Sequence, residues 1–334
     1  MMPTPQNEAI EAFRFMMNVP NFKRPVALPR PFNGQELAKE ALKRALKLRQ
    51  EQGINFYDPI CPFDIAARLD VEVWLQNIPS MEGMFCRKNG HSLIVLASER
   101  PSGRQNYTCA HEIGHHVFEH GESLDEMLDK EATRAHGAAR RRHTDPKEFS
   151  ADSFAGFLLM PRAAVDRAFA RRNIKIQDAT PEQIFLVANA LGVGYATLVT
   201  HLHVSLRLLN NQHADELKRS VTKLSKIRAA LMGSPVKHVT VVDDAWEGRP
   251  VDVHIGDHLI LPHDWVEESG YLEALGHTPP QALCRGSIYR ATRQGQSELI
   301  APHKTLKLRV SRQGFEGRSI YRHLDDPDDE GEEE

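Results

Sequence analysis

The sequence His-Glu-Ile-Gly-His at residues 111–115 places two histidines four residues apart. Residues at that spacing on a helix project from one face, so His111 and His115 can present two imidazoles to one metal ion. Zinc suits these ligands, because it accepts neutral nitrogen donors and takes no part in redox chemistry. Glu112 then faces the open coordination position, where it can accept a proton from a water activated by the metal. The pattern predicts a hydrolytic zinc centre; a solvated helix face with incidental His and Glu is the alternative.

A catalytic zinc centre needs a third protein ligand and one open position. Glu148 and Asp152 stand on one face of a second predicted helix, which stops at Pro161. Glu148 can reach the ion, and Asp152 can hydrogen-bond a ligating imidazole and so set its tautomer. A surface helix with two incidental acids is the alternative. The apolar residues expected to bury this helix against the first are Ala151, Phe154, Ala155, Leu158 and Leu159.

A competing pattern, His-Val-Phe-Glu-His, spans residues 116–120 and has the inverted order of metal ligands. One step along a helix turns the side-chain direction by about 100°, so both sets cannot face the same ion. We favour the first set, because Gly114 lets another chain element approach and a helix with Glu148 follows. His120 is expected to cap the helix end as a cation, and His116 to be half-exposed.

Two polar residues just before the motif, Tyr107 and Arg104, are candidates for stabilising the transition state beside the metal. A structural role is the interpretation that we favour for each. The preceding strands, around 83–87 or 93–98, are candidates for an exposed edge on which an extended peptide substrate adds as a further strand.

Several elements are predicted to position these residues. Leu and Ala recur at helical spacing over 35–52, with Gly53 at the end. A short helix follows Pro62, residues 71–76 alternate as in a strand, and Asn89-Gly90 predicts a hairpin over 83–98. The helix with the motif is expected to close at Gly121. A polar, basic excursion over 122–146 precedes the second helix, and helical patterns continue to Met232.

Thr180-Pro-Glu-Gln183 is a capping box that opens a helix, a tight turn and another helix, as in a helix-turn-helix. The second of these helices has no Arg or Lys until Arg207, so phosphate and base contacts would be scarce. A unit that packs against the rest of the chain or docks a partner protein is therefore favoured over direct DNA binding.

Beyond Met232 the pattern changes to short alternating segments between turns, which predicts strands over 236–242, 251–255, 258–261, 286–293, 297–302, 305–311 and 318–324. The chain is therefore predicted to be α+β, with a zincin-like metallopeptidase domain, a small β-sheet with an active-site helix, a helical extension, and a separate C-terminal β-rich domain of unknown role. The expected boundaries are an N-terminal arm (1–33), the peptidase domain (34–175), the helical extension (176–232), the β-rich domain (233–324) and an acidic, disordered tail (325–334).

Composition narrows the class of protein. The 334 residues are 41% hydrophobic and 26% charged, as in a globular protein, and the net charge of -3 indicates no strong attraction to nucleic acid or membrane. The four cysteines are scattered and form no Cys-x-x-Cys pair, which argues against a disulfide framework or a thiolate zinc site. The N-terminus has no secretory pattern and no long apolar run follows, so we expect a cytoplasmic protein.

Residues 104–120 and 148–161 together resemble the ImmA/IrrE family of metallopeptidases, within a stretch from about Pro62 to Leu209. The second block, Glu-Phe-Ser-Ala-Asp-Ser-Phe-Ala-Gly-Phe-Leu-Leu-Met-Pro, departs from the family pattern at Ser150, where an acid is common. The resemblance implies zinc ligands at His111, His115 and Glu148 and a catalytic base at Glu112. It also implies cytoplasmic cleavage of a regulatory protein, often a helix-turn-helix repressor.

The expected function is therefore that of a zinc-dependent endopeptidase acting on a protein such as a helix-turn-helix transcriptional repressor. The alternative is a DNA-binding or repressor-sequestering regulator with a metal site that is only structural. A structural zinc site is closed by four protein ligands, whereas this sequence offers three.

Overall fold

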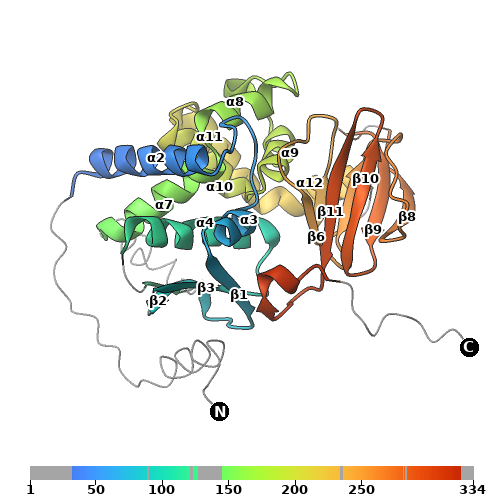
Figure 1. The fold of residues 1–334 in the computed structure, drawn as a ribbon. Helices are drawn as coiled ribbons and strands as arrows, with labels where there is room; N and C mark the ends of the chain where they lie inside the picture. Colours follow the sequence, from blue (N-terminus) through green and yellow to red (C-terminus); the bar gives the residue numbers. More distant parts are fainter. Residues whose placement is uncertain are drawn as a thin grey trace, which may run out of the picture. The chain divides into compact units, whose positions relative to one another are not determined.

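The computed structural model describes residues 32–88, 90–120, 123–126, 145–233, 236–280, 282 and 284–324 (Figure 1). The predicted N-terminal arm before Phe32, most of the polar excursion and the acidic tail from residue 325 lie outside these ranges. From Asn33 onward the chain groups into one unit.

A five-stranded sheet with the order β12-β1-β3-β2-β4 lies below helix α4 in Figure 1. Its inner strands are β1 (Val71–Gln76), β3 (His91–Ala97) and β2 (Met81–Lys88). β1 runs parallel to β3, and β3 pairs antiparallel with β2. The edge strands are β4 (Ser123–Glu126) and β12 (Gly317–Arg318), each antiparallel to its neighbour.

The strand at 71–76 and the hairpin are confirmed. Val71, Val73 and Leu75 alternate inward, as a half-buried strand requires. Gly90 has a φ of 84°, a conformation that the tight turn needs and that glycine adopts without steric cost.

Neither strand of the hairpin is an edge of the sheet, so the predicted peptide-binding edge is wrong. β3 lies between β1 and β2, and β4 covers the other side of β2 through the pairs Met84↔Leu124 and Phe85↔Ser123. β4 is only four residues long and falls in the polar stretch, where the sequence shows no clear alternation. Its pairing with β2 is a long-range contact, which local patterns do not reveal.

Helix α4 (Ser102–Phe118) contacts β2 and β3, and α7 (Pro146–Leu159) packs against α4. α2 (Gly34–Glu51) lies along α7, while α3 (Pro62–Arg68) contacts β1 and α4 (Figure 1). A Cβ at Gly114 would lie 3.1 Å from Ala151 Cα, so this glycine allows α4 and α7 to approach closely.

The predicted helices are confirmed, but α4 ends at Phe118 rather than at Gly121. Glu119 adopts a left-handed conformation with a φ of 55°, which terminates the helix before a glycine is needed. Asp145 caps α7 by accepting a hydrogen bond from the Lys147 N–H.

The helical segment continues to Met232, as predicted. It comprises α8 (Arg162–Ala170), α9 (Pro181–Leu191), α10 (Tyr195–Thr200), α11 (Asn211–Arg219) and α12 (Leu224–Met232). Two short 3-10 helices, η1 (Ile176–Asp178) and η3 (Ser220–Lys223), and one π-helical segment, η2 (His201–Ser205), lie between them. The capping box at Thr180 is present, and Gly192 ends α9 with a φ of 69°. Leu198 and Val199 of α10 and Leu202 of η2 are fully buried. Within the described ranges no single helix has the length and apolarity to cross a membrane, although α9 joined to Tyr195–Ser205 at a 101° bend reaches both.

The C-terminal β region has two sheets of its own, with the orders β10-β11-β6 and β5-β7-β9-β8 (Figure 1). Their strands are β5 (Val239–Val241), β6 (Val251–His254), β7 (His258–Leu261), β8 (Leu272–His277), β9 (Ser287–Ala291), β10 (Gly295–Ala301) and β11 (Lys304–Ser311). Trp246 and Trp265 are buried in a cluster that belongs mainly to this region. A separate β-rich region is therefore present, as predicted, although β8 was not among the expected strands.

The last predicted strand, over 318–324, is wrong. Only Gly317–Arg318 is extended, and Ser319–Tyr321 forms the turn η4. This short strand pairs with β1, where Trp74 is opposite Arg318, and the Arg318 guanidinium donates to the Glu72 carboxylate at 3.0 Å. The end of the β region thus returns to the sheet below α4.

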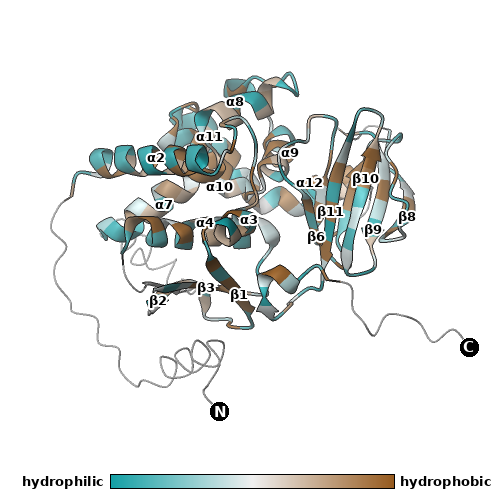
Figure 2. Ribbon diagram, viewed as in Figure 1, coloured by the Kyte–Doolittle hydropathy of each residue, from teal (hydrophilic) through white to brown (hydrophobic). Residues whose placement is uncertain are grey.

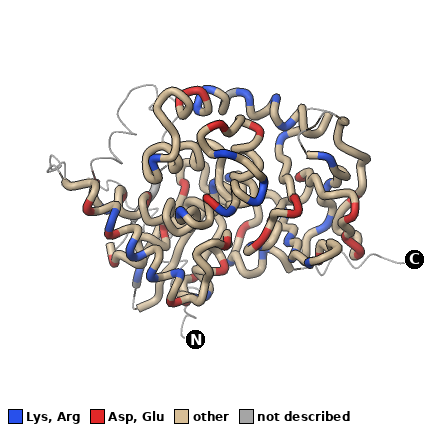
Figure 3. Tube along the Cα trace, turned by 90° about the horizontal axis from the view of Figure 1, so that it is seen from above, with Lys and Arg blue, Asp and Glu red and all other residues tan. Residues whose placement is uncertain are grey.

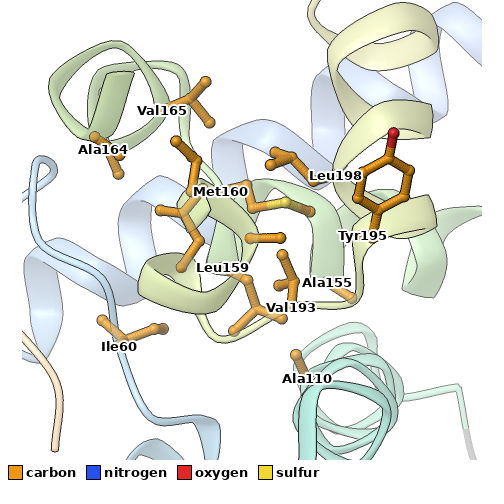
Figure 4. Packing of buried hydrophobic residues seen from close by; sticks show 14 of the residues in the cluster. Ile60, Ala110, Ala155, Leu159, Met160, Ala164, Val165, Val193, Tyr195 and Leu198 are labelled. Carbon is orange, nitrogen blue, oxygen red and sulfur yellow. The ribbon is translucent and has the colours of Figure 1, made fainter. Parts of the chain in front are cut away.

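Apolar residues are concentrated on the strands of this sheet and on the facing sides of its helices (Figure 2). In Figure 4, Ala110 of α4 points toward Ala155 of α7 and toward Val193 in the turn after α9. These small side chains let the helix that carries the histidines sit deep in the core.

Ion pairs link the helices to the C-terminal β region. Arg172 holds Asp243 through two hydrogen bonds of 2.6 and 2.7 Å, and Arg309 reaches Asp64 of α3 at 2.9 Å. Basic and acidic residues are interspersed along the trace (Figure 3), which provides such pairs between elements far apart in sequence.

Candidate metal centre

Helix α4 presents His111, Glu112 and His115 from its buried half, where their exposed fractions are 2%, 0% and 1%. The helix is covered by the sheet on one side and by α7 on another, so three polar residues are enclosed with it. The two Nε2 atoms of His111 and His115 lie 3.0 Å apart, and the imidazoles therefore face one point, as the spacing of four residues predicts.

Glu148 approaches the same point from the first turn of α7. Its Oε2 lies 3.3 Å from Nε2 of His111, and its Oε1 lies 3.6 Å from Nε2 of His115. The three ligand atoms are all within 4.8 Å of one another. Two donors bound to one tetrahedral zinc at about 2.0–2.1 Å are separated by roughly 3.3 Å, so this spacing fits a single ion held by all three residues.

Asp152 stands one turn after Glu148 on α7 and contacts the other side of His111. Its Oδ1 lies 3.0 Å from Nδ1 of His111. A carboxylate in this position accepts the Nδ1 proton and leaves Nε2 with a lone pair for the metal. The sequence-predicted pair of acids thus contacts His111 through both ring nitrogens.

The pKa values of His111, His115 and Glu148 depend on one another. Burial alone would lower the pKa of His111, but hydrogen bonds to Asp152 and Glu148 outweigh it and raise that pKa well above its ordinary value. Burial, together with the charge on His111, lowers the pKa of His115 to about 3. Burial would raise the pKa of Glu148, but its hydrogen bond to His111 lowers it. The two carboxylates therefore favour a positive charge on His111, whereas His115 beside it is favoured in the neutral form.

Glu112 is enclosed by strand β2 at a position where the strand has no side chain. A Cβ at Gly83 would lie 2.9 Å from Oε1 of Glu112 and would overlap the methyl group of Thr108. Gly83 therefore allows β2 to pass directly over the carboxylate. The sequence analysis did not single out Gly83, because a glycine in a strand shows its purpose only when the opposing side chain is known.

The region around the metal cluster matches a known protein family. Residues 66–203 match the sequence model of the IrrE N-terminal-like domain, peptidase family M78. This chain carries an IrrE N-terminal-like domain. The matched range includes His111, Glu112 and His115 of α4 and Glu148 and Asp152 of α7.

No curated protein matches this sequence. Among solved structures, a Mycobacterium tuberculosis transcriptional regulator is similar over 52% of this chain and 52% of its own, with 16% identity and a TM-score of 0.31. Amebosin is similar over 22% of this chain and 99% of its own, with 16% identity and a TM-score of 0.15. This chain thus spans about half the length of the first of these proteins.

In the IrrE-like domain, Tyr107 and Arg104 both contact other protein groups. The Tyr107 hydroxyl donates to the backbone carbonyl of Asp152 at 3.1 Å and so joins α4 to α7 beside the cluster. Arg104 donates to Glu82 of β2 at 2.7 Å, and its side chain is 59% exposed. Both contacts join elements of the protein, and a role of either residue in stabilising the transition state stays a prediction.

Among the residues that the structure describes, the competing His116 and His120 belong to no group of possible metal ligands. His116 is half-buried, as predicted, and its Nδ1 lies 3.1 Å from the Ser92 hydroxyl of β3. His120 was expected to cap α4 as a cation, but burial, with a further contribution from Lys147, lowers its pKa to about 4. Its Nδ1 lies instead 3.2 Å from Nδ1 of His115. His120 therefore orients the imidazole of His115. A spacing of five residues between two histidines does not predict this contact.

Proposed function

We propose that this protein is a zinc-dependent endopeptidase that cleaves a regulatory protein such as a helix-turn-helix repressor. The observation that supports this most is the grouping of His111, His115 and Glu148 around one point, with the buried Glu112 carboxylate on the same helix as both histidines. Three ligands leave one position open for water and substrate, as hydrolytic zinc sites require.

Each residue has a distinct part in the proposed reaction. When bound, zinc supplies Lewis acidity toward a peptide carbonyl and activates a water molecule for attack. Glu112 accepts the proton of that water on a carboxylate oxygen and passes it to the departing amine nitrogen. Asp152 holds His111 in the tautomer that binds metal through Nε2, and His120 holds His115 through its Nδ1.

The substrate class comes from the family resemblance rather than from the geometry. Within this class, the candidate is a small helix-turn-helix protein encoded beside this chain. Its cleavage would release the genes that it represses.

Two variants test the proposal separately for metal and for catalysis. Glu112→Gln keeps the volume and the ligand set, so it should retain zinc by elemental analysis and lose cleavage of the neighbouring repressor by about a thousandfold or more. Glu148→Gln should lose both the bound zinc and the cleavage activity. Glu119→Gln, at an exposed carboxylate just after α4, is the matched control and should keep both the zinc and the cleavage activity.

Cleavage by Glu112→Gln at the wild-type rate would contradict the proposed role of Glu112. Full zinc content in Glu148→Gln would contradict the proposed ligand set.

A further inference from the structure

A second feature of the chain lies away from the metal cluster, where the first turn of α4, the α9–α10 turn and the β region meet. A cavity of about 480 Å³ opens there. Sites for small molecules measure roughly 300–1,000 Å³, so the cavity is large enough for a ligand of mononucleotide size.

One wall of the cavity is the N-terminus of α4, a helix of 17 residues. Pro101 precedes it and provides no side-chain cap. The amides of Ser102 and Gly103 are in the first turn, where an α-helix offers no carbonyl partner. Such a turn attracts anions, because its N–H groups point outward at the positive end of the helix dipole.

Arg249 is an independent sign of an anion site. The residue is 7% exposed, and its Nε is buried with no hydrogen-bond partner. Within the described ranges its guanidinium makes no ion pair either, although its carbon lies 5.1 Å from the centre of the Trp246 ring. Burial lowers the pKa of this arginine, although the charges of Asp252 and Asp64 act in the opposite direction.

The helix terminus and the arginine face the same turn of the chain. A Cβ at Gly192 would overlap the Arg249 guanidinium, and a Cβ at Gly103 would lie 3.0 Å from the Val193 carbonyl carbon. Arg249 and the first turn of α4 therefore contact neighbouring residues of the α9–α10 turn. Both groups also line the same cavity.

The rest of the lining indicates the body of the ligand. The lining includes four apolar side chains, those of Phe185, Val193, Leu224 and Val239. Further positive charge comes from Lys237, an exposed residue at the rim.

Arg228 and three acidic residues also line the cavity. The guanidinium of Arg228 donates to the carbonyls of Leu224 and Lys237. Asp252 lies 3.9 Å from Arg309, and Asp257 lies 3.4 Å from His254. These two acids thus have basic neighbours of their own, whereas Glu99 remains as a local negative charge.

We propose that this cavity binds a small molecule with one oxyanion, a phosphate or a carboxylate, and an apolar or aromatic body. The oxyanion lies between the Arg249 guanidinium and the Ser102 and Gly103 amides, and the body lies against Phe185 and Val239. The site is at the N-terminus of the helix that carries His111, Glu112 and His115, but binding there requires neither metal nor cleavage.

The test is isothermal titration of the full chain at constant ionic strength with two anionic probes and their neutral counterparts. Adenosine 5′-monophosphate is compared with adenosine, and 1-naphthoate with 1-naphthalenemethanol. At least one anion should bind at millimolar concentration or below, and its neutral counterpart should not. The anion that binds distinguishes a phosphate ligand from a carboxylate one.

Arg249→Met should weaken anion binding by about tenfold or more, because a charge-assisted hydrogen bond is lost. Lys237→Met, at an exposed position that does not endanger folding, should weaken it by about two- to fivefold. Arg293→Met and Lys307→Met are exposed controls in the same β region and should leave binding unchanged.

Failure of both anions to bind, or binding that is unaffected in every cavity variant that folds, would overturn the proposal. Should Arg249→Met not fold, Lys237→Met decides the outcome by itself.

Discussion

The Nδ1 atom of His111 on α4 lies 3.0 Å from Oδ1 of Asp152 on α7. Because Glu148 contacts Nε2 of the same ring, α7 contacts this histidine at both of its nitrogens. The orientation of the first imidazole is therefore set by the neighbouring helix, and this relationship leads to the first prediction.

Asp152→Asn should weaken zinc binding by about 10- to 100-fold, because the amide oxygen still accepts the Nδ1 proton but no longer carries charge. The affinity is measured by competition with a chromophoric chelator. Asp166→Asn, at a carboxylate on α8 that pairs with Arg162, is the control. Equal zinc affinity in wild type and Asp152→Asn would show that Asp152 does not support the ligand.

Gly83→Ala should destabilise the protein by about 1–3 kcal/mol, because the added methyl group meets Thr108 and Glu112 in a packed region. The free energy of unfolding is measured in urea. Thr108→Ser in the same chain should restore part of the loss, since it removes the methyl group that the new Cβ overlaps. Gly34→Ala, whose Cβ would lie 3.4 Å from the Phe149 ring, is the tolerated control. A stable Gly83→Ala variant would contradict the close approach of β2 to α4.

His201 should make stability depend on pH. Its Nε2 lies 2.9 Å from the Met160 carbonyl oxygen, and burial lowers its pKa from 6.5 to about 4. Between these values the unfolded chain binds a proton that the folded chain does not bind. The free energy of unfolding should therefore fall as pH falls through this window, by about 3 kcal/mol in total.

The measurement is urea unfolding across this pH range, compared with His201→Gln. Glutamine keeps a hydrogen-bond donor but does not titrate, so this variant should lose that share of the pH dependence. His91→Gln, at an exposed histidine on β3, should keep the wild-type profile. If the free energy of unfolding of His201→Gln depends on pH as in the wild type, groups other than His201 cause the pH dependence.

Arg172 and Asp243 should be coupled energetically across the junction between α8 and the β region. The arginine side chain is 7% exposed, and both of its bonds to the carboxylate are short. A double-mutant cycle with alanine should give a coupling energy of about 1–3 kcal/mol in urea unfolding. The exposed pair Arg162–Asp166 should give no more than about 0.5 kcal/mol. Equal coupling in the two pairs would mean that burial adds nothing at this junction.

The sequence by itself determined the local part of this protein. The spacing of His111 and His115 places both on one face of a helix, because the period of an α-helix depends only on the backbone. The Thr180 capping box and the Gly90 turn are likewise contacts between near neighbours, and both are present. The ImmA/IrrE resemblance also rests on two contiguous blocks of residues.

Only the tertiary structure decided how distant segments meet. It placed β4 beside β2, which removed the expected free edge, and it returned the chain end to β1 as β12. It turned His120 toward His115 and brought Arg249 against the α9–α10 turn. These contacts join residues with no regular spacing in sequence. Their geometry depends on the packing of whole helices and sheets, which no local period encodes.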